Sequence, residues 1–203
     1  MRFRILITTL IAVFVINSGT SYADLLTYDF VNDFDDATQV GSGIYDGVTV
    51  NLSATHVDAG QLFSQSLPGL DLLTNGSAPF GIFEVTFSKP VNLEVDFWNL
   101  TGAAAERFQN FSVLPTQFVS LAPSHTWTGS ALHGGGIRDD ISTFRWNGIT
   151  ALTFESGDSV PGGSDSVQEI ALRLNAVPEP SSACLTIIVL GIFSVRRRRI
   201  ENI

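Results

Sequence analysis

Two neighbouring segments of the chain alternate strictly between apolar and polar side chains. Residues 83–87 are Phe-Glu-Val-Thr-Phe, and residues 91–97 are Val-Asn-Leu-Glu-Val-Asp-Phe. A period of two is typical of a β-strand with one buried face and one solvated face. Ser88, Lys89 and Pro90 lie between the two segments as a short turn. The alternation therefore predicts a β-hairpin that turns one face toward a core.

The same signals recur along most of the chain. Asn147-Gly148 predicts a second hairpin, because both residue types tolerate positive φ, and residues 45–47 form a turn before another strand. Only residues 103–108 look helical. Strands are expected at residues 26–30, 48–52, 83–87, 91–97, 110–114, 117–121, 126–132, 144–146, 151–154 and 170–174. This pattern predicts an all-β fold, a single jelly-roll-like antiparallel β-sandwich whose first and last strands pair.

The predicted sandwich is strongly acidic. Between Asp24 and Pro180 the chain has 19 Asp or Glu against 5 Lys or Arg, a formal net charge of −14. Such a field repels nucleic acids, so we exclude them as partners. The only cysteine, Cys184, lies beyond the sandwich. Without disulfides, the domain depends on its hydrophobic core for stability.

The first 23 residues have the features of a secretory signal peptide. Arg2 and Arg4 precede an apolar run from residue 5 to 16, and the triplet Ser-Tyr-Ala ends at Ala23. Signal peptidase recognises this order of a basic, an apolar and a small-residue region. We expect cleavage between Ala23 and Asp24, so that an extracytoplasmic domain spans residues 24–176. The alternative is a buried N-terminal helix.

The segment after this domain combines three features. Val177 is followed by Pro178, Glu179 and Pro180, then by a mostly apolar stretch over residues 183–195. The basic cluster comes next: Arg196, Arg197, Arg198 and Arg199. An apolar segment of this length is short for a bilayer span, but tilt and local thinning accommodate it, and the arginines would stay on the cytoplasmic side. We expect a single transmembrane helix at about residues 183–195; the alternative is a core helix with a basic end.

The order of these features resembles the PEP-CTERM sorting signal of bacteria that produce exopolysaccharide. The resemblance covers residues 177–203 and is carried by Pro178-Glu179-Pro180, the apolar segment and the four arginines. It implies that an exosortase-type membrane enzyme is a partner, which processes the tail near the Pro-Glu-Pro motif. The ectodomain would then be held at the cell surface or released into the matrix, where exopolysaccharide is a further possible partner.

Two loops of the predicted sandwich have unusual compositions. Asp29, Asp33, Asp35 and Asp36 lie close together in sequence, and clustered carboxylates of this kind suit Ca²⁺, although no known calcium-loop spacing is present. We therefore expect either a solvated acidic loop or a structural calcium site. Residues 134–136 are three consecutive glycines, which do not fit a phosphate-binding loop and favour a flexible one.

Three tryptophans are candidates for stacking on sugars. Trp98 and Trp146 continue strand alternations, which favours core packing, whereas Trp127 has the weakest core pattern of the three and is the sugar-stacking candidate. We assign no catalytic residues and no metal ligands, because the nucleophile and zinc motifs of known hydrolases are missing from the sequence. Glu94 and Asp96 share a strand face, which is expected to be the solvated face of the first hairpin.

The sequence thus supports three hypotheses, in order of preference. The first is an exported surface or matrix protein with a structural or adhesive ectodomain and no enzymatic activity. The second is a carbohydrate-binding module on the same anchor, which an exposed strip of aromatic side chains would favour. The third is a glycoside-hydrolase-like enzyme, which converging carboxylates in a cleft would favour.

Overall fold

The computed structural model describes residues 24–55, 63–65, 69–74, 80–101, 106–158 and 166–177. These residues form antiparallel strands and one short helix, so the predicted all-β fold is confirmed. In chain order the elements are β1 (Leu26–Thr27), α2 (Phe30–Asp33), β2 (Phe34–Asp35), β3 (Val40–Tyr45), β4 (Val48–Thr55), β5 (Phe63–Gln65), β6 (Leu70–Thr74), β7 (Gly81–Trp98), β8 (Glu106–Gln109), β9 (Gln117–Ser120), β10 (Thr126–Trp127), β11 (Ala131–His133), β12 (Ser142–Asp158) and β13 (Ser166–Ala176).

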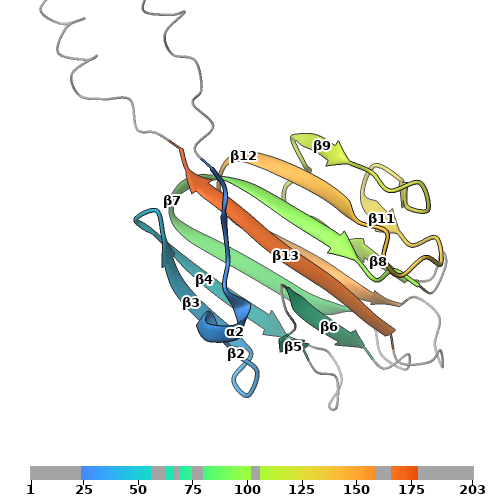
Figure 1. Cartoon of the computed structure of the whole chain (residues 1–203), viewed down its shortest axis with the longest axis horizontal. Helices are drawn as coiled ribbons and strands as arrows, with labels where there is room; N and C mark the ends of the chain where they lie inside the picture. Colours follow the sequence, from blue (N-terminus) through green and yellow to red (C-terminus); the bar gives the residue numbers. More distant parts are fainter. Residues whose placement is uncertain are drawn as a thin grey trace, which may run out of the picture.

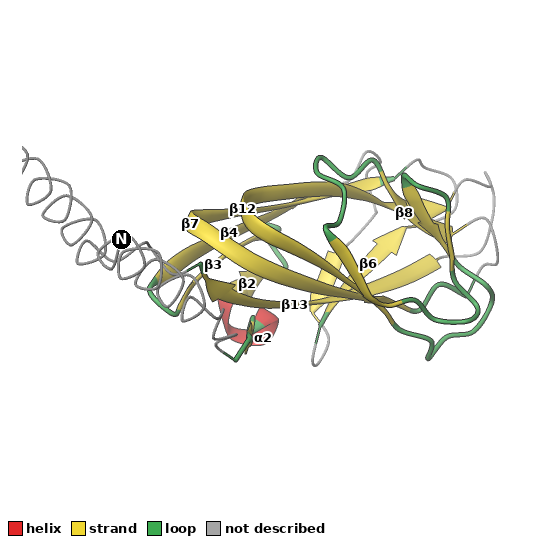
Figure 2. Ribbon diagram, turned by 90° about the horizontal axis from the view of Figure 1, so that it is seen from above, coloured by secondary structure: helices red, strands yellow, loops and turns green. Residues whose placement is uncertain are grey.

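The strands lie in two layers that β7 and β12 connect (Figures 1 and 2). The first layer has the order β2–β3–β4–β7–β12–β8–β11–β10 and uses residues 81–87 of β7 and 151–158 of β12. The second layer has the order β9–β12–β7–β13–β6–β5 and uses residues 142–146 of β12 and 91–98 of β7. β1 pairs with the end of β13.

The predicted hairpins around Ser88-Lys89-Pro90 and Asn147-Gly148 are both wrong. Residues 82–87 of β7 pair with β4 on one side and β12 on the other, and residues 91–97 pair with β12 and β13. Because both edges of each half are occupied, the halves cannot pair with one another. The chain does reverse at these positions, but it passes from one layer to the other, and the β7–β12 register shifts there. Gly148 has a φ of +67°, which suits this irregularity.

Aromatic side chains from both layers fill the space between them. Phe97 of the second layer lies 5.6 Å from Phe154 and 4.6 Å from Phe108 of the first layer, measured between ring centroids. Phe154 in turn packs on Phe83, its register partner in β7, at 5.1 Å. These side chains are fully buried, so the apolar half of each alternation faces the core as predicted.

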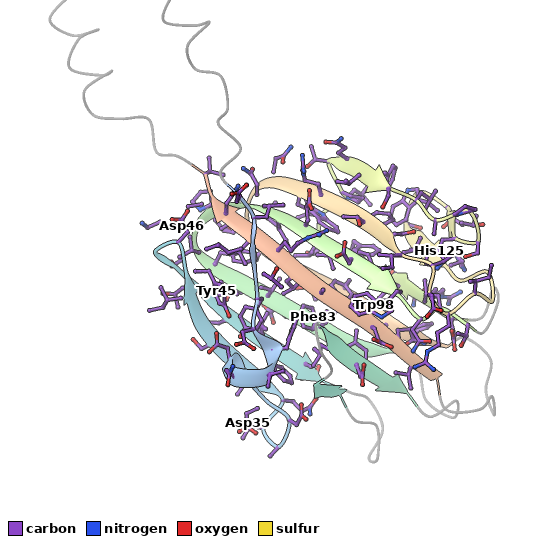
Figure 3. All side chains as sticks on the ribbon, in the orientation of Figure 1. Asp35, Tyr45, Asp46, Phe83, Trp98 and His125 are labelled. Carbon is purple, nitrogen blue, oxygen red and sulfur yellow. The ribbon has the colours of Figure 1, made fainter. Side chains whose placement is uncertain are left out.

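The first and last strands of the domain meet at one end of the sandwich. Leu26 pairs with Leu174, which confirms the predicted pairing of the first and last strands. The backbone N–H of Val177, the last described residue, donates to the carbonyl of Pro90 at 3.0 Å, so Val177 lies beside the bend of β7. We call this the terminal end and the opposite one the distal end; Figure 3 labels Asp46 near the former and His125 near the latter.

Three local expectations are corrected and one is confirmed. Residues 106–109 form β8 rather than part of a helix, residues 110–114 form a loop, and residues 126–132 contain the separate strands β10 and β11. The turn before β4 is a two-residue hairpin turn, because Asp46 and Gly47 both have positive φ, as a type I′ turn requires.

Candidate functional site

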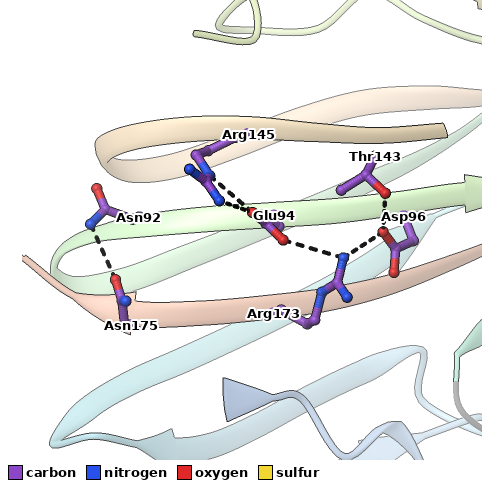
Figure 4. A network of polar contacts seen from close by, with 7 residues as sticks. All are labelled: Asn92, Glu94, Asp96, Thr143, Arg145, Arg173 and Asn175. Carbon is purple, nitrogen blue, oxygen red and sulfur yellow. Dashed lines mark hydrogen bonds and ion pairs between the residues drawn. The ribbon is translucent and has the colours of Figure 1, made fainter. Parts of the chain in front are cut away.

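A network of polar side chains covers the outer face of the second layer, on its three central strands (Figure 4). These side chains alternate with the core-facing residues of β7, β12 and β13, so they point away from the aromatic core. We call this group the polar face, and its members are Asn92, Glu94, Asp96, Thr143, Arg145, Arg173 and Asn175.

Glu94 is the centre of the polar face. In the strand register it lies opposite Arg145 on β12 and opposite Arg173 on β13. Arg145 donates to Oε1 of Glu94 through Nε at 2.9 Å and also through Nη2, and Nη2 of Arg173 lies 3.2 Å from Oε2. Glu94 is only 5% exposed, although its face was expected to be solvated. The longer side chains around it exclude water from the carboxylate.

Asp96 extends the network toward the distal end. Its Oδ1 accepts from the hydroxyl of Thr143 at 2.6 Å and from Nη2 of Arg173 at 2.7 Å. The residue opposite Asp96 on β13 is Ala171. Because this side chain is small, Arg173 can reach Asp96 diagonally across the two strands. Toward the terminal end, Nδ2 of Asn92 donates to Oδ1 of Asn175 at 3.1 Å.

The polar face thus consists of mutually paired groups. Two guanidinium groups neutralise two carboxylates across three strands, and each contact joins residues that are register neighbours or one diagonal step apart. Cross-strand pairs of this kind fix strand register, because a slip by one residue would break all of them. The glycoside-hydrolase hypothesis required carboxylates that converge in a cleft. On this face the carboxylates of Glu94 and Asp96 are instead paired with arginines.

Trp98 lies on the same face, at its distal end. Its indole N–H donates to Oε2 of Glu169 at 2.7 Å, and Nδ2 of Asn99 donates to Oε1 of the same carboxylate at 3.0 Å. Burial raises the pKa of Glu169 above its ordinary value, with a further contribution from the charge of Asp71, against the lowering effect of these hydrogen bonds. Glu169 fixes the orientation of the indole ring.

The three tryptophans do not form one aromatic strip. Trp146 is fully buried and donates to the carbonyl of Val113 at 2.9 Å. Trp127 is half-buried against the core, with ring contacts at 5.6 Å to Phe111, 5.6 Å to Phe118 and 5.2 Å to Phe144. Trp127 and Trp98 therefore lie in different surroundings, and the stacking role of Trp127 stays a prediction.

The acidic residues near the N-terminal side of the domain serve local structure. Asp29 caps α2 by accepting from the backbone of Val31 and Asn32, and the side-chain hydrogen bond from Asn32 lowers its pKa. Asp35 accepts from the N–H of Ala37 and the hydroxyl of Thr38.

Asp33 accepts from the hydroxyl of Tyr45 at 2.5 Å. Burial and this hydrogen bond raise the pKa of Tyr45 to about 12. Within the described part of the chain, no group of three or more His, Cys, Asp or Glu side chains converges as metal ligands would. The structure therefore gives no support to a calcium site formed by Asp29, Asp33, Asp35 and Asp36.

A buried histidine–serine pair lies at the distal end, and sequence analysis missed it. Nδ1 of His125 lies 2.8 Å from Oγ of Ser142, which also accepts from the N–H of Ala122. Burial lowers the pKa of His125, against the raising effect of nearby Asp140. Ser142 is fully buried and His125 is 4% exposed, so the hydroxyl is not placed to attack a substrate in solvent. No motif joins the two residues in sequence.

The three consecutive glycines are tightly packed. A Cβ on Gly135 would lie 1.7 Å from the carbonyl oxygen of Ser124, and one on Gly134 would lie 2.5 Å from that of Leu100. The N–H of Gly134 donates to the carbonyl of Glu106. The glycines allow three distal loops to approach one another closely, which differs from the flexible loop that sequence analysis favoured.

The other candidate residues belong to the first and last segments of the sequence. Ala23, the Pro178-Glu179-Pro180 motif and the cluster Arg196, Arg197, Arg198 and Arg199 lie outside the described residues, as does the apolar segment 183–195. In the part of the chain that the structure describes, no helix has the length and apolar character needed to cross a membrane. No protein-family model, curated protein or solved structure matches this chain.

Proposed function

We propose that the chain is an exported protein of the cell surface or extracellular matrix, delivered through a PEP-CTERM signal and processed by an exosortase-type enzyme. Its jelly-roll-like sandwich has a structural or adhesive role and no catalytic one. Signal peptidase removes residues 1–23, and the helix at residues 183–195 holds the ectodomain at the membrane until processing.

The position of Val177 is the observation that carries this proposal. Val177 directly precedes Pro178-Glu179-Pro180 and is hydrogen bonded to Pro90. A residue bonded into the sandwich therefore lies directly before the proposed recognition motif in the sequence. The pairing of Leu26 with Leu174 puts the start of the described domain at the same end. The proposal therefore has the leader and the tail on one side of the domain, with the distal loops away from the membrane.

The test is performed in an exopolysaccharide-producing bacterium that has an exosortase. The full chain is compared with a Pro178→Ala, Glu179→Ala, Pro180→Ala variant, and a Pro123→Ala variant is the control for loss of an exposed loop proline. Mass spectrometry of surface and culture material should find Asp24 as the first residue and no peptide containing Arg196 to Arg199. The triple variant should stay in the membrane fraction with its tail intact, whereas the control should be processed normally.

Two outcomes would contradict the sorting proposal. One is recovery of surface material that retains the arginine cluster, and the other is normal processing of the triple variant. Either would leave the tail as a simple anchor.

Carbohydrate binding is the second candidate function. It is favoured by two features of the same sheet face: the planar amide and guanidinium groups of the polar face, which suit the hydroxyl groups of a sugar, and the indole of Trp98, which Glu169 holds at the distal end. Titration of the host's exopolysaccharide into the protein tests it. Binding should weaken in Trp98→Ala if the polar face is the site and in Trp127→Ala if Trp127 is the site; no binding to the unaltered chain excludes both.

A further inference from the structure

A long uncharged segment crosses one side of this acidic protein. Residues 110–137 contain no Asp, Glu, Lys or Arg, although the charged residues of the whole chain number 31. The segment includes β9 and its flanking loops. All of the net charge of −14 between Asp24 and Pro180 is therefore carried by the rest of the domain.

β9 lies at the margin of the second layer (Figure 1). Among the described strands it pairs only with β12, so its other edge presents backbone N–H and carbonyl groups to the surroundings. Apolar side chains on and beside β9 are exposed. They are Val113 (43%), Leu114 (56%), Phe118 (44%), Val119 (45%) and Leu121 (43%), and we call them with β9 the β9 edge.

Proteins normally protect an exposed strand edge from pairing with other chains. The usual means are a charged side chain, a proline within the strand, or a bulge that turns the edge away. β9 has the sequence Gln-Phe-Val-Ser, with neither a charge nor a proline, although its register with β12 shifts once at Val119. The exposed apolar side chains would further favour contact with another strand.

The distribution of charge indicates which partner the β9 edge would bind. Two domains of net charge −14 repel one another over most of their surfaces, and the repulsion is weakest where both present the uncharged segment. A second copy supplies a matching uncharged strand, whereas a basic partner would gain more by binding elsewhere. We propose that two copies of this chain associate through antiparallel pairing of β9 with β9 of the second copy.

This pairing has a defined geometry. A symmetric antiparallel pair has a two-fold axis perpendicular to the sheet, so the two copies point in opposite directions along their strands. β9 is antiparallel to residues 143–145 of β12, which lie along the long axis of the sandwich (Figure 1). The two terminal ends would therefore face away from each other. Such a pair joins two separate surfaces, which is the geometry of adhesion.

The experiment uses the full chain in detergent, with Cys184→Ser to remove the native thiol. Single cysteines are introduced in turn at Gln117, Phe118, Val119 and Ser120, and disulfide-linked dimers are measured under mild oxidation. At least one position should give a dimer with the mass of two identical chains. Ile44→Cys is the control, since Ile44 is the most exposed large apolar residue (76%) of the described chain and lies on β3, away from β9.

Sedimentation of charge variants gives the second measurement. Val119→Lys should weaken association by about tenfold or more, because it places two like charges across the pair, whereas Ile44→Lys should not weaken it. A cross-link to a different protein, no cross-link at any β9 position, or association unchanged by Val119→Lys would each overturn the proposal. The tail could also associate in detergent, but it would not produce cross-links that depend on β9.

Discussion

Arg145 and Glu94 lie directly opposite each other on β12 and β7, and Nε of Arg145 is 2.9 Å from Oε1 of Glu94. We predict that Glu94→Gln lowers the free energy of unfolding by about 1–3 kcal/mol, because two arginines lose their buried partner while remaining partly solvated. Glu84→Gln is the matched control, since Glu84 is exposed on the other half of the same strand, and it should change stability by less than about 0.5 kcal/mol. Urea unfolding of both variants measures the difference, and equal effects would refute the role of the network.

The burial of His125 gives a prediction for pH. Its folded-state pKa is lowered, so the unfolded chain binds a proton more readily and stability should fall as pH drops below about 6.5. The slope from this one group is at most about 1.4 kcal/mol per pH unit. His125→Gln should lose less stability than the unaltered protein between about pH 7.5 and 5.5, as measured by thermal unfolding. A His125→Gln protein with unchanged pH dependence would exclude His125 as its source.

The glycine loop offers a test of close packing. Gly135→Ala should destabilise the protein by about 1–3 kcal/mol or more, because the new methyl group would overlap the carbonyl oxygen of Ser124. Ile137→Ala, two residues away at an exposed position, should have an effect within about 0.5 kcal/mol. If chemical denaturation finds Gly135→Ala neutral, the loops do not approach as closely as the structure indicates.

The bend of β12 should depend on the backbone conformation of Gly148. A Cβ at Gly148 would meet no atom within 4 Å, so any cost of substitution comes from its φ of +67°. Gly148→Ala should cost about 1–2 kcal/mol. Gly148→Asn should recover part of this loss, because asparagine tolerates positive φ better than alanine does. Thermal unfolding that ranks Asn at or below Ala would argue against a left-handed backbone here.

The alternation of β7 predicted which side chains are buried but not which strands are neighbours. Phe83, Val85, Val95 and Phe97 are buried as expected, since a period of two specifies the face on which each residue lies. The same period occurs whether consecutive segments pair in one sheet or lie in opposite layers. The two halves of β7 lie in opposite layers because β4 and β13 pair with the edges that a hairpin would have used.

The candidate sites were less predictable than the strands. Glu94 belonged to a face expected to be solvated, and its burial results from Arg145 and Arg173, which are 51 and 79 residues away in sequence. His125 and Ser142 likewise meet only through the fold. β3 was missed because its glycines and serine produce no apolar face. Contacts between distant residues leave no local pattern in a single sequence.

The hydrogen bond from Val177 to Pro90 also determines how the domain would respond to force. A pull on the tail acts at Val177 along the axis of β13, which pairs with β7 from Glu169 to Ala176. If the distal end is held, this load shears the β13–β7 ladder lengthwise, so its hydrogen bonds must break together rather than one after another. The strand that precedes the proposed tail would thus be loaded in the direction in which its ladder hydrogen bonds share the force, as the proposed tethering would require.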